Sequence, residues 1–145
     1  MLKKTITCQD FNGVERTEDF FFNLTEAELA ELELSENGGY TEWVKSIVNA
    51  GDSKTLAKIF KDIILKSYGE KTPDGKMFVK KDKDGYDLCN NFAQTAAYSA
   101  LYMELITNAD KASEFMNGIV PPELLKRAQE QQALQTNAQH PALKQ

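Results

Sequence analysis

The amino-acid sequence predicts a mainly α-helical, single-domain protein with an N-terminal β-hairpin and a flexible C-terminal tail. β-forming residues on both sides of Asn12-Gly13 indicate the hairpin. Several later segments repeat apolar residues at the spacing of amphipathic helices. With 145 residues, of which 41% are apolar, the chain has the size of one domain. We therefore expect a domain over 1–122, including a hairpin at about 1–23, followed by a short helix and a disordered tail over 123–145.

The hairpin prediction depends on Asn-Gly, which suits a two-residue turn because both central residues of a type I′ turn need a positive φ. A two-residue loop places Phe11 opposite Val14 and Thr5 opposite Phe20. In that register one face carries two phenylalanines of the second predicted strand together with the two residues that flank the turn, and the other face carries the apolar residues of the first predicted strand together with Phe21. The expected faces are Phe11, Val14, Phe20 and Phe22 on one side, and Leu2, Ile6, Cys8 and Phe21 on the other.

Three helices are expected in the first half of the chain. Thr25 and Glu28 have the spacing of a capping box, which predicts a helix over 25–34. Apolar residues at helical spacing predict a second helix over 40–51 and a third from about residue 53 to Tyr68. Gly69 fits the position directly after the third helix, where a left-handed conformation ends many helices.

The second half predicts a break followed by more helices. Turn sequences at 72–75 and 81–85 flank a short extended segment at 76–80. Apolar stripes then predict one long helix over 86–107 and a shorter one from Asn108 or Asp110 to Gly118. Pro121-Pro122 suits the first turn of a final helix. Six of the last seventeen residues are glutamine, which predicts the disordered tail.

The sequence lacks the residue patterns of common catalytic and metal sites. His140 is the only histidine, and it stands in the polar tail without a cysteine or carboxylate cluster beside it. Cys8 and Cys89 lie far apart and belong to no CxxC motif, so we interpret both as reduced, half-buried residues. The glycines form no phosphate-binding loop. We expect no cofactor, no metal and no enzymatic activity.

Net charge and hydropathy bear on the kind of partner. The net charge of −5 disfavours binding to nucleic acid, which needs concentrated lysine and arginine. No segment approaches the roughly 20 apolar residues of a membrane helix, and the residues after the N-terminal Met1 form no secretion signal. We expect a cytoplasmic protein whose partners are other proteins.

Charge is distributed unevenly along the chain. Between Gln9 and Glu36 there are nine acidic residues and one basic residue, Arg16. Between Lys54 and Lys83 there are nine lysines and four acidic residues. Each region is either a solvated surface that meets nothing or a surface that contacts a partner of opposite charge.

Three consecutive aromatic residues, Phe20, Phe21 and Phe22, stand at the end of the second predicted strand. Successive side chains of a strand point to opposite faces of a sheet, so these rings must occupy both faces. The second face is either covered by helices of the same chain or contacts a partner. The sequence leaves both alternatives open, and we take the three residues as candidates for partner binding.

Four segments of the chain have a sequence and an order that match a known family. They are residues 10–29, DFNGVERTEDFFFNLTEAEL, residues 64–78, ILKSYGEKTPDGKMF, Thr95 to Tyr98, and residues 115–121, FMNGIVP. With these segments the chain resembles the tail assembly chaperones of long-tailed phages and prophages of Gram-positive bacteria. The resemblance covers roughly residues 4–122, although residues 82–87 form a more charged spacer than the family pattern has.

The resemblance implies a non-enzymatic protein that coats the tape-measure protein, keeps it soluble, helps to recruit tail-tube subunits and leaves before the virion is complete. Many members of that family are also made in a longer, frameshifted form. The alternative is a cytoplasmic adaptor or regulatory module of phage origin with no role in the tail.

A chaperone that coats a long client needs copies that contact one another, and complementary charges would orient a head-to-tail contact. We therefore predict self-association in which acidic residues of one copy face lysines of the next, with Glu15, Glu18 and Glu26 on one side and Lys58, Lys61 and Lys80 on the other.

Overall fold

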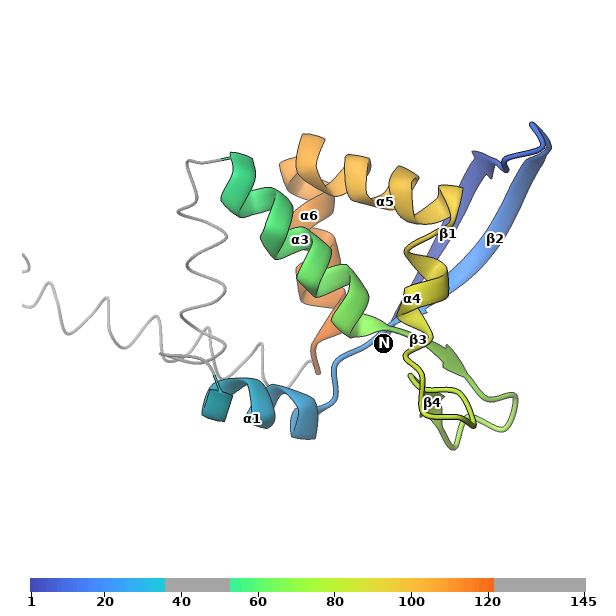
Figure 1. Ribbon diagram of the computed structural model, residues 1–145. Coiled ribbons are helices and arrows are strands. Elements are labelled where there is room, and N and C mark those ends of the chain that lie inside the picture. The colour runs from blue at the N-terminus through green and yellow to red at the C-terminus, as the bar shows by residue number, and fades with distance from the viewer. Residues whose placement is uncertain (36–52, 122–145) are drawn as a thin grey trace, which may run out of the picture.

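The computed structural model describes residues 1–35 and 53–121, which form a four-stranded antiparallel sheet and five helices (Figure 1). The sheet order is β1-β2-β3-β4. The strands are β1 (Leu2–Gln9), β2 (Glu15–Phe22), β3 (Tyr68–Lys71) and β4 (Phe78–Val79). The described helices are α1 (Glu26–Ser35), α3 (Ser53–Ser67), α4 (Cys89–Phe92), α5 (Ala96–Thr107) and α6 (Ala109–Ile119).

The prediction of a mainly α-helical fold is wrong, because the fold mixes helices with a sheet of four strands. The hairpin at the N-terminus is extended by β3, whose first two residues pair with the last two of β2. β4 then pairs with β3 through Val79 and Phe78. The sequence pattern missed β3 because Tyr68 continues the apolar spacing of the preceding helix, whereas the strand partners of Tyr68 and Gly69 lie on the distant β2.

The hairpin itself is present, but its predicted register is wrong by one residue. Thr5 lies opposite Asp19 and Leu2 opposite Phe22. The loop has three residues instead of two: the Asp10 amide donates to the carbonyl oxygen of Val14 at 2.8 Å, and Gly13 has φ +79°. A type I turn followed by a left-handed glycine gives this loop. Because a one-residue slip moves every side chain of a strand to the opposite face, Phe20 and Phe22 share a face with Leu2 and Ile6.

The Asp10 side chain explains why the longer loop forms. Its carboxylate accepts hydrogen bonds from the backbone amides of Asn12 and Val14 and from Arg16 Nε, the last at 2.7 Å. These bonds, led by the one from Arg16, lower the pKa of Asp10. Asp82 closes the turn before Tyr86 in the same way, with Gly85 at φ +86°. Asp82 to Gly85 is therefore a turn whose carboxylate caps its own backbone.

The start of α1 agrees with the sequence prediction, and the end of α3 does not. The predicted capping box is confirmed, because the Glu28 amide donates to Thr25 Oγ1 at 3.2 Å and the Thr25 amide donates to Glu28 Oε1 at 3.0 Å. The role predicted for Gly69 is wrong, because α3 ends at Ser67 and Gly69 lies in β3 without a positive φ. A Cβ on Gly69 would lie 2.5 Å from Cε2 of Phe78, so glycine is required there for close packing.

The helix predicted over 86–107 is also wrong in extent, since it is divided into α4 and α5. Thr95 causes the division: its hydroxyl donates to the Phe92 carbonyl oxygen at 2.7 Å and accepts from the Tyr98 amide at 3.2 Å. A threonine side chain bonded in this way ends one helix and caps the next. The change of direction lets Phe92 stack on Tyr68, with ring centroids 4.3 Å apart.

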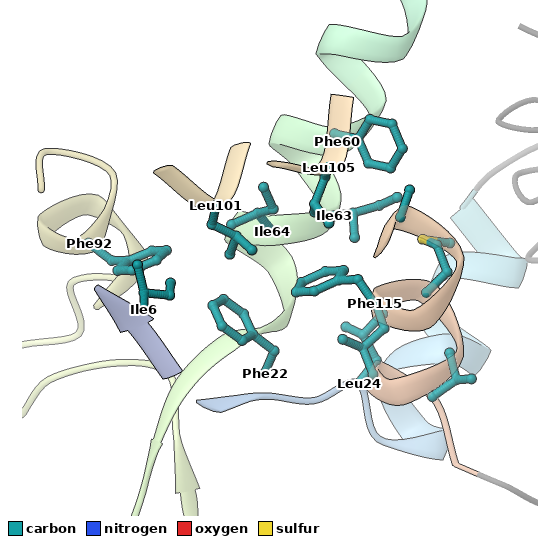
Figure 2. Packing of buried hydrophobic residues seen from close by; sticks show 14 of the residues in the cluster. Ile6, Phe22, Leu24, Phe60, Ile63, Ile64, Phe92, Leu101, Leu105 and Phe115 are labelled. Atoms are coloured by element: carbon teal, nitrogen blue, oxygen red, sulfur yellow. The ribbon is translucent and has the colours of Figure 1, made fainter. Parts of the chain in front are cut away.

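The hydrophobic core lies between the sheet and helices α3, α5 and α6 (Figure 2). Phe22 is completely buried, and its ring makes edge contacts with those of Phe92 and Phe115 at centroid distances of 5.8 and 5.2 Å. Phe60 and Leu101 complete the helical side of this core. Ser67, the one buried polar residue among the described residues, donates its hydroxyl to the Ile63 carbonyl oxygen at 2.7 Å.

Several predictions fall outside the described residues. They are the helix over 40–51, the helix that opens at Pro122, the domain boundary there and the disordered tail over 123–145. By contrast, the short helix after Asn108 is confirmed as α6, with Asn108 Oδ1 accepting from the Lys111 amide at 3.1 Å.

Candidate partner-binding surface

The three consecutive phenylalanines divide between the two faces of the sheet. Phe22 is fully buried in the core, and Phe20 packs against Phe92 with ring centroids 5.2 Å apart. Phe21 points to the opposite face, where it is half-buried and lies across from Gly69 on β3. Of the three rings, Phe21 is therefore the one that stands on the face turned away from the core.

We call this face the outer face; it carries Phe21, Gly69 and Phe78, together with the alternate residues of β1 and β2 that include Thr5, Thr7, Thr17 and Asp19. Toward the hairpin tip the outer face is polar: Thr5 Oγ1 donates to Asp19 Oδ1 at 2.6 Å, and the hydroxyls of Thr7 and Thr17 are 2.9 Å apart. Toward β3 and β4 it becomes aromatic, because the Phe78 ring covers Gly69.

A cleft of about 500 Å³ opens beside β2, where β2 and β3 diverge. β2 pairs with β1 along eight residues but with β3 only at Phe21 and Phe22. The cleft contains acidic, aromatic and basic side chains from both strands, and its lining is Glu18, Asp19, Phe20 and Phe21 from β2 and Tyr68, Gly69, Glu70 and Lys71 from β3. Burial, followed by the charge of Glu70, raises the pKa of Tyr68 above the ordinary value of a tyrosine phenol.

The predicted charged residues do not form one surface. Glu15 and Glu18 are exposed on β2, and Lys58 and Lys61 are exposed on α3. Glu26 is exposed at the start of α1 and has an interaction partner within the chain. Figure 1 shows the hairpin and α3 as separate parts of the molecule, so acidic and basic groups of one copy are presented in different places.

Lys80 is different, because its ammonium group is bonded within the chain. Its Nζ donates to the carbonyl oxygen of Asn23 at 2.9 Å and to that of Lys66 at 2.8 Å, and it pairs with Glu28. These bonds join three elements: the end of α3, the connection after β2, and α1. Burial opposes ionisation of Glu28, but the hydrogen bonds from Lys80 and from the Thr25 amide outweigh it and lower the pKa of Glu28.

The described residues offer no arrangement of metal ligands: residues 1–35 and 53–121 contain no group of three histidine, cysteine, aspartate or glutamate side chains placed to hold an ion. Cys89 is half-buried, and burial followed by the charge of Asp87 raises the pKa of its thiol. Among the described helices, none has the length and apolar character required to cross a membrane.

A comparison with known families decides the class of protein. The profile of the family described as phage tail assembly chaperone matches residues 1–145. The chain belongs to the phage tail assembly chaperone family. Neither a curated protein nor a solved structure matches it. A role in phage tail assembly follows from membership of this family, and tail proteins are its class of partner.

Three residues that line the cleft on this family member were among the candidates for partner binding: Glu18, Phe20 and Phe21. They were visible in the sequence as an acidic strand with consecutive aromatic residues, but the sequence predicted no cleft, and their role in binding stays a prediction. The β3 side of the cleft was missed, because Tyr68 and Gly69 were assigned to the end of a helix, and Glu70 and Lys71 to the break before the turn at 72–75. A signal was present in Gly69, since a glycine inside a strand often marks close approach of another group.

Proposed function

We propose that this protein is a non-enzymatic tail assembly chaperone that binds the tape-measure protein of its phage, keeps that protein soluble and helps to recruit tail-tube subunits. It acts in the cytoplasm of the host cell and is absent from the mature virion. The observation that carries this proposal is membership of the tail assembly chaperone family over residues 1–145.

The cleft beside β2 supports a role in binding a polypeptide. Its walls combine the aromatic rings of Phe21 and Tyr68 with the charged side chains of Glu18, Glu70 and Lys71. Aromatic and charged side chains around an open cleft suit contact with another protein, because rings supply apolar area and charges orient the partner.

Self-association is part of the proposal. A long client requires several copies of the chaperone, and a head-to-tail contact uses two different surfaces of each copy. Glu15 and Glu18 on β2 and Lys58 and Lys61 on α3 are exposed and of opposite charge. Lys80 contributes less to such a contact, because its ammonium group is bonded to Glu28 and to two carbonyl oxygens of its own chain.

Co-expression with the tape-measure protein of the same phage tests the main proposal. We expect the tape-measure protein to remain in the soluble fraction and to co-purify with the chain, and to precipitate when it is expressed alone. A complex of the two should then capture purified tail-tube protein, whereas the tape-measure protein alone should not remain soluble long enough to do so.

The alternative is a cytoplasmic adaptor or regulatory module with no role in the tail. It predicts that the tape-measure protein has the same solubility with and without the chain, and that the two do not co-purify. An unrelated acidic protein of similar size, co-expressed at the same level, controls for a general effect of expression on solubility.

A further inference from the structure

The edge of β2 between Glu15 and Phe20, which we call the β2 edge, has backbone groups that no described strand pairs with. The Asp10–Val14 hydrogen bond fixes which residues of the hairpin face each other, because bonded and non-bonded pairs alternate along an antiparallel ladder. The N–H and C=O groups of Glu15, Thr17 and Asp19 therefore point away from β1. The bond from the Asn23 amide to the Ser67 carbonyl oxygen, at 2.7 Å, continues the same alternation.

β3 occupies only the end of this edge. It pairs with β2 at Phe21 and Phe22, and beyond Gly69 it turns toward β4 instead of continuing along β2. The cleft of about 500 Å³ lies in the resulting fork, so a chain placed along the β2 edge would also contact the side chains of Tyr68 and Glu70. An unpaired strand with a cleft beside it has the geometry that accepts an added β-strand.

The charges around the cleft favour an added strand of positive charge. Glu18, Asp19 and Glu70 line the cleft against a single lysine, Lys71. Arg16, the one basic residue of β2, is bonded to Asp10 at 2.7 Å. A segment rich in lysine or arginine would therefore be attracted, and an acidic segment would be repelled. The same argument disfavours pairing between the β2 edges of two copies, because both edges are acidic.

We propose that the β2 edge binds an extended, basic polypeptide segment of about six residues, which adds to the sheet as a strand and places the side chains of one face beside Phe21 and those of the other face beside Tyr68. Backbone hydrogen bonds supply the pairing, and the acidic cleft supplies the preference for basic residues. That this segment belongs to the tail client rests on the proposed function, whereas the binding site itself is inferred from the β2 edge and the cleft alone.

Two proline variants of the full chain form a matched pair for the test. Thr17→Pro removes an outward N–H from the β2 edge, and Thr7→Pro removes one from the opposite edge of the same hairpin. Both variants lose the same bond, the 2.9 Å contact between the hydroxyls of Thr7 and Thr17. Proline is tolerated on edge strands where its nitrogen faces away from the ladder, and thermal melting checks that both variants stay folded.

The probe is a synthetic hexapeptide of alternating lysine and valine, with a glutamate–valine peptide as the charge control. NMR hydrogen exchange on the full chain should show slower exchange of the Thr17 and Asp19 amides when the lysine peptide is added. Thr17→Pro should weaken binding about tenfold, as expected for the loss of one backbone hydrogen bond together with a clash, and Thr7→Pro should bind like the wild type. Equal binding by both variants, or no protection of Asp19, would overturn the proposal.

Two further outcomes are decisive. Equal binding of the glutamate peptide would overturn the preference for basic segments, and self-association that Thr17→Pro alone abolishes would show that a second copy occupies the edge. The co-expressed tape-measure protein separates this inference from the proposed function. If the tape-measure protein binds the wild type and Thr17→Pro equally, the client uses another surface of the chain, and the chaperone role is unaffected. If it binds neither protein, the chaperone role is wrong, and the peptide experiment still tests whether the β2 edge accepts a strand.

Discussion

The two ends of the β1–β2 hairpin have the same strand pairing but different surroundings. At the open end, Leu2 and Phe22 face each other and pack into the core, where Phe22 is completely buried. At the tip, Phe11 is 84% exposed and Val14 is 55% exposed. Figure 1 shows that the tip extends beyond the helices that cover the other end. The comparison teaches that tertiary packing stabilises the open end, whereas local hydrogen bonds alone shape the tip.

The largest expected effect comes from one substitution made at each end of the hairpin. Phe22→Ala should lower the free energy of unfolding by about 3–5 kcal/mol, because it removes a buried ring that contacts Phe92 and Phe115. Phe11→Ala removes the same atoms from an exposed site and should change stability by less than about 0.5 kcal/mol. Urea denaturation measures both values. Similar losses in the two variants would contradict the division of the hairpin into a packed and an exposed end.

A second, smaller effect is expected where Lys80 secures the packed end. Lys80→Met should cost about 1–2 kcal/mol, since it removes the pair with Glu28 and the bonds to the carbonyl oxygens of Asn23 and Lys66. Lys81→Met is the matched control: Lys81 pairs with Asp87 at 3.6 Å and both side chains are more than half exposed, so little stability should be lost. Equal losses in the free energy of unfolding for the two variants, measured by chemical denaturation, would show that the Lys80 bonds add no more stability than an exposed ion pair.

A third effect concerns pH. The pKa of Glu28 is lowered in the folded state, so its ionised form contributes stability above the ordinary glutamate pKa. That contribution is lost as the pH falls through the folded-state value. Glu28→Gln should therefore be less stable than the wild type at neutral pH, and the difference should shrink as the solution is acidified below about pH 4. Denaturation curves at several pH values that keep a constant difference between the two proteins would contradict this assignment.

The smallest effect on stability is expected from charges near the tip. Reversing Glu15 and Glu18 to lysine should leave the monomer folded, because both side chains are exposed, yet it should disrupt self-association. A compensating exchange of Lys58 and Lys61 to glutamate should restore association. Sedimentation velocity over a salt series measures both, since attraction between exposed charges is screened over about 8–10 Å at physiological salt. A monomer at every salt concentration, or an oligomer insensitive to salt, would remove the electrostatic contact.

Sequence by itself determined the elements whose causes are local. The capping box of Thr25 and Glu28 and the helix that begins at Asn108 or Asp110 were both predicted from short spacings and are present in the structure, which places the cap of α6 at Asn108. The hairpin was predicted as well, because Asn-Gly between β-forming residues is a local signal. Phe21 and Glu18 were named as candidates for the same reason, since their pattern lies within one strand.

Tertiary structure decided the existence of β3 and β4 and the cleft between β2 and β3, whereas the register of the hairpin was decided by side-chain contacts at its tip that the Asn-Gly signal does not show. The register depends on three hydrogen bonds to the Asp10 carboxylate, which lengthen the loop beyond the turn that Asn-Gly alone favours. β3 exists because Tyr68 and Gly69 meet a strand more than forty residues away in the sequence. The cleft exists because that pairing stops after two residues. Local patterns fix where a strand or helix can form, but the partners that a strand meets are set by the packing of distant segments.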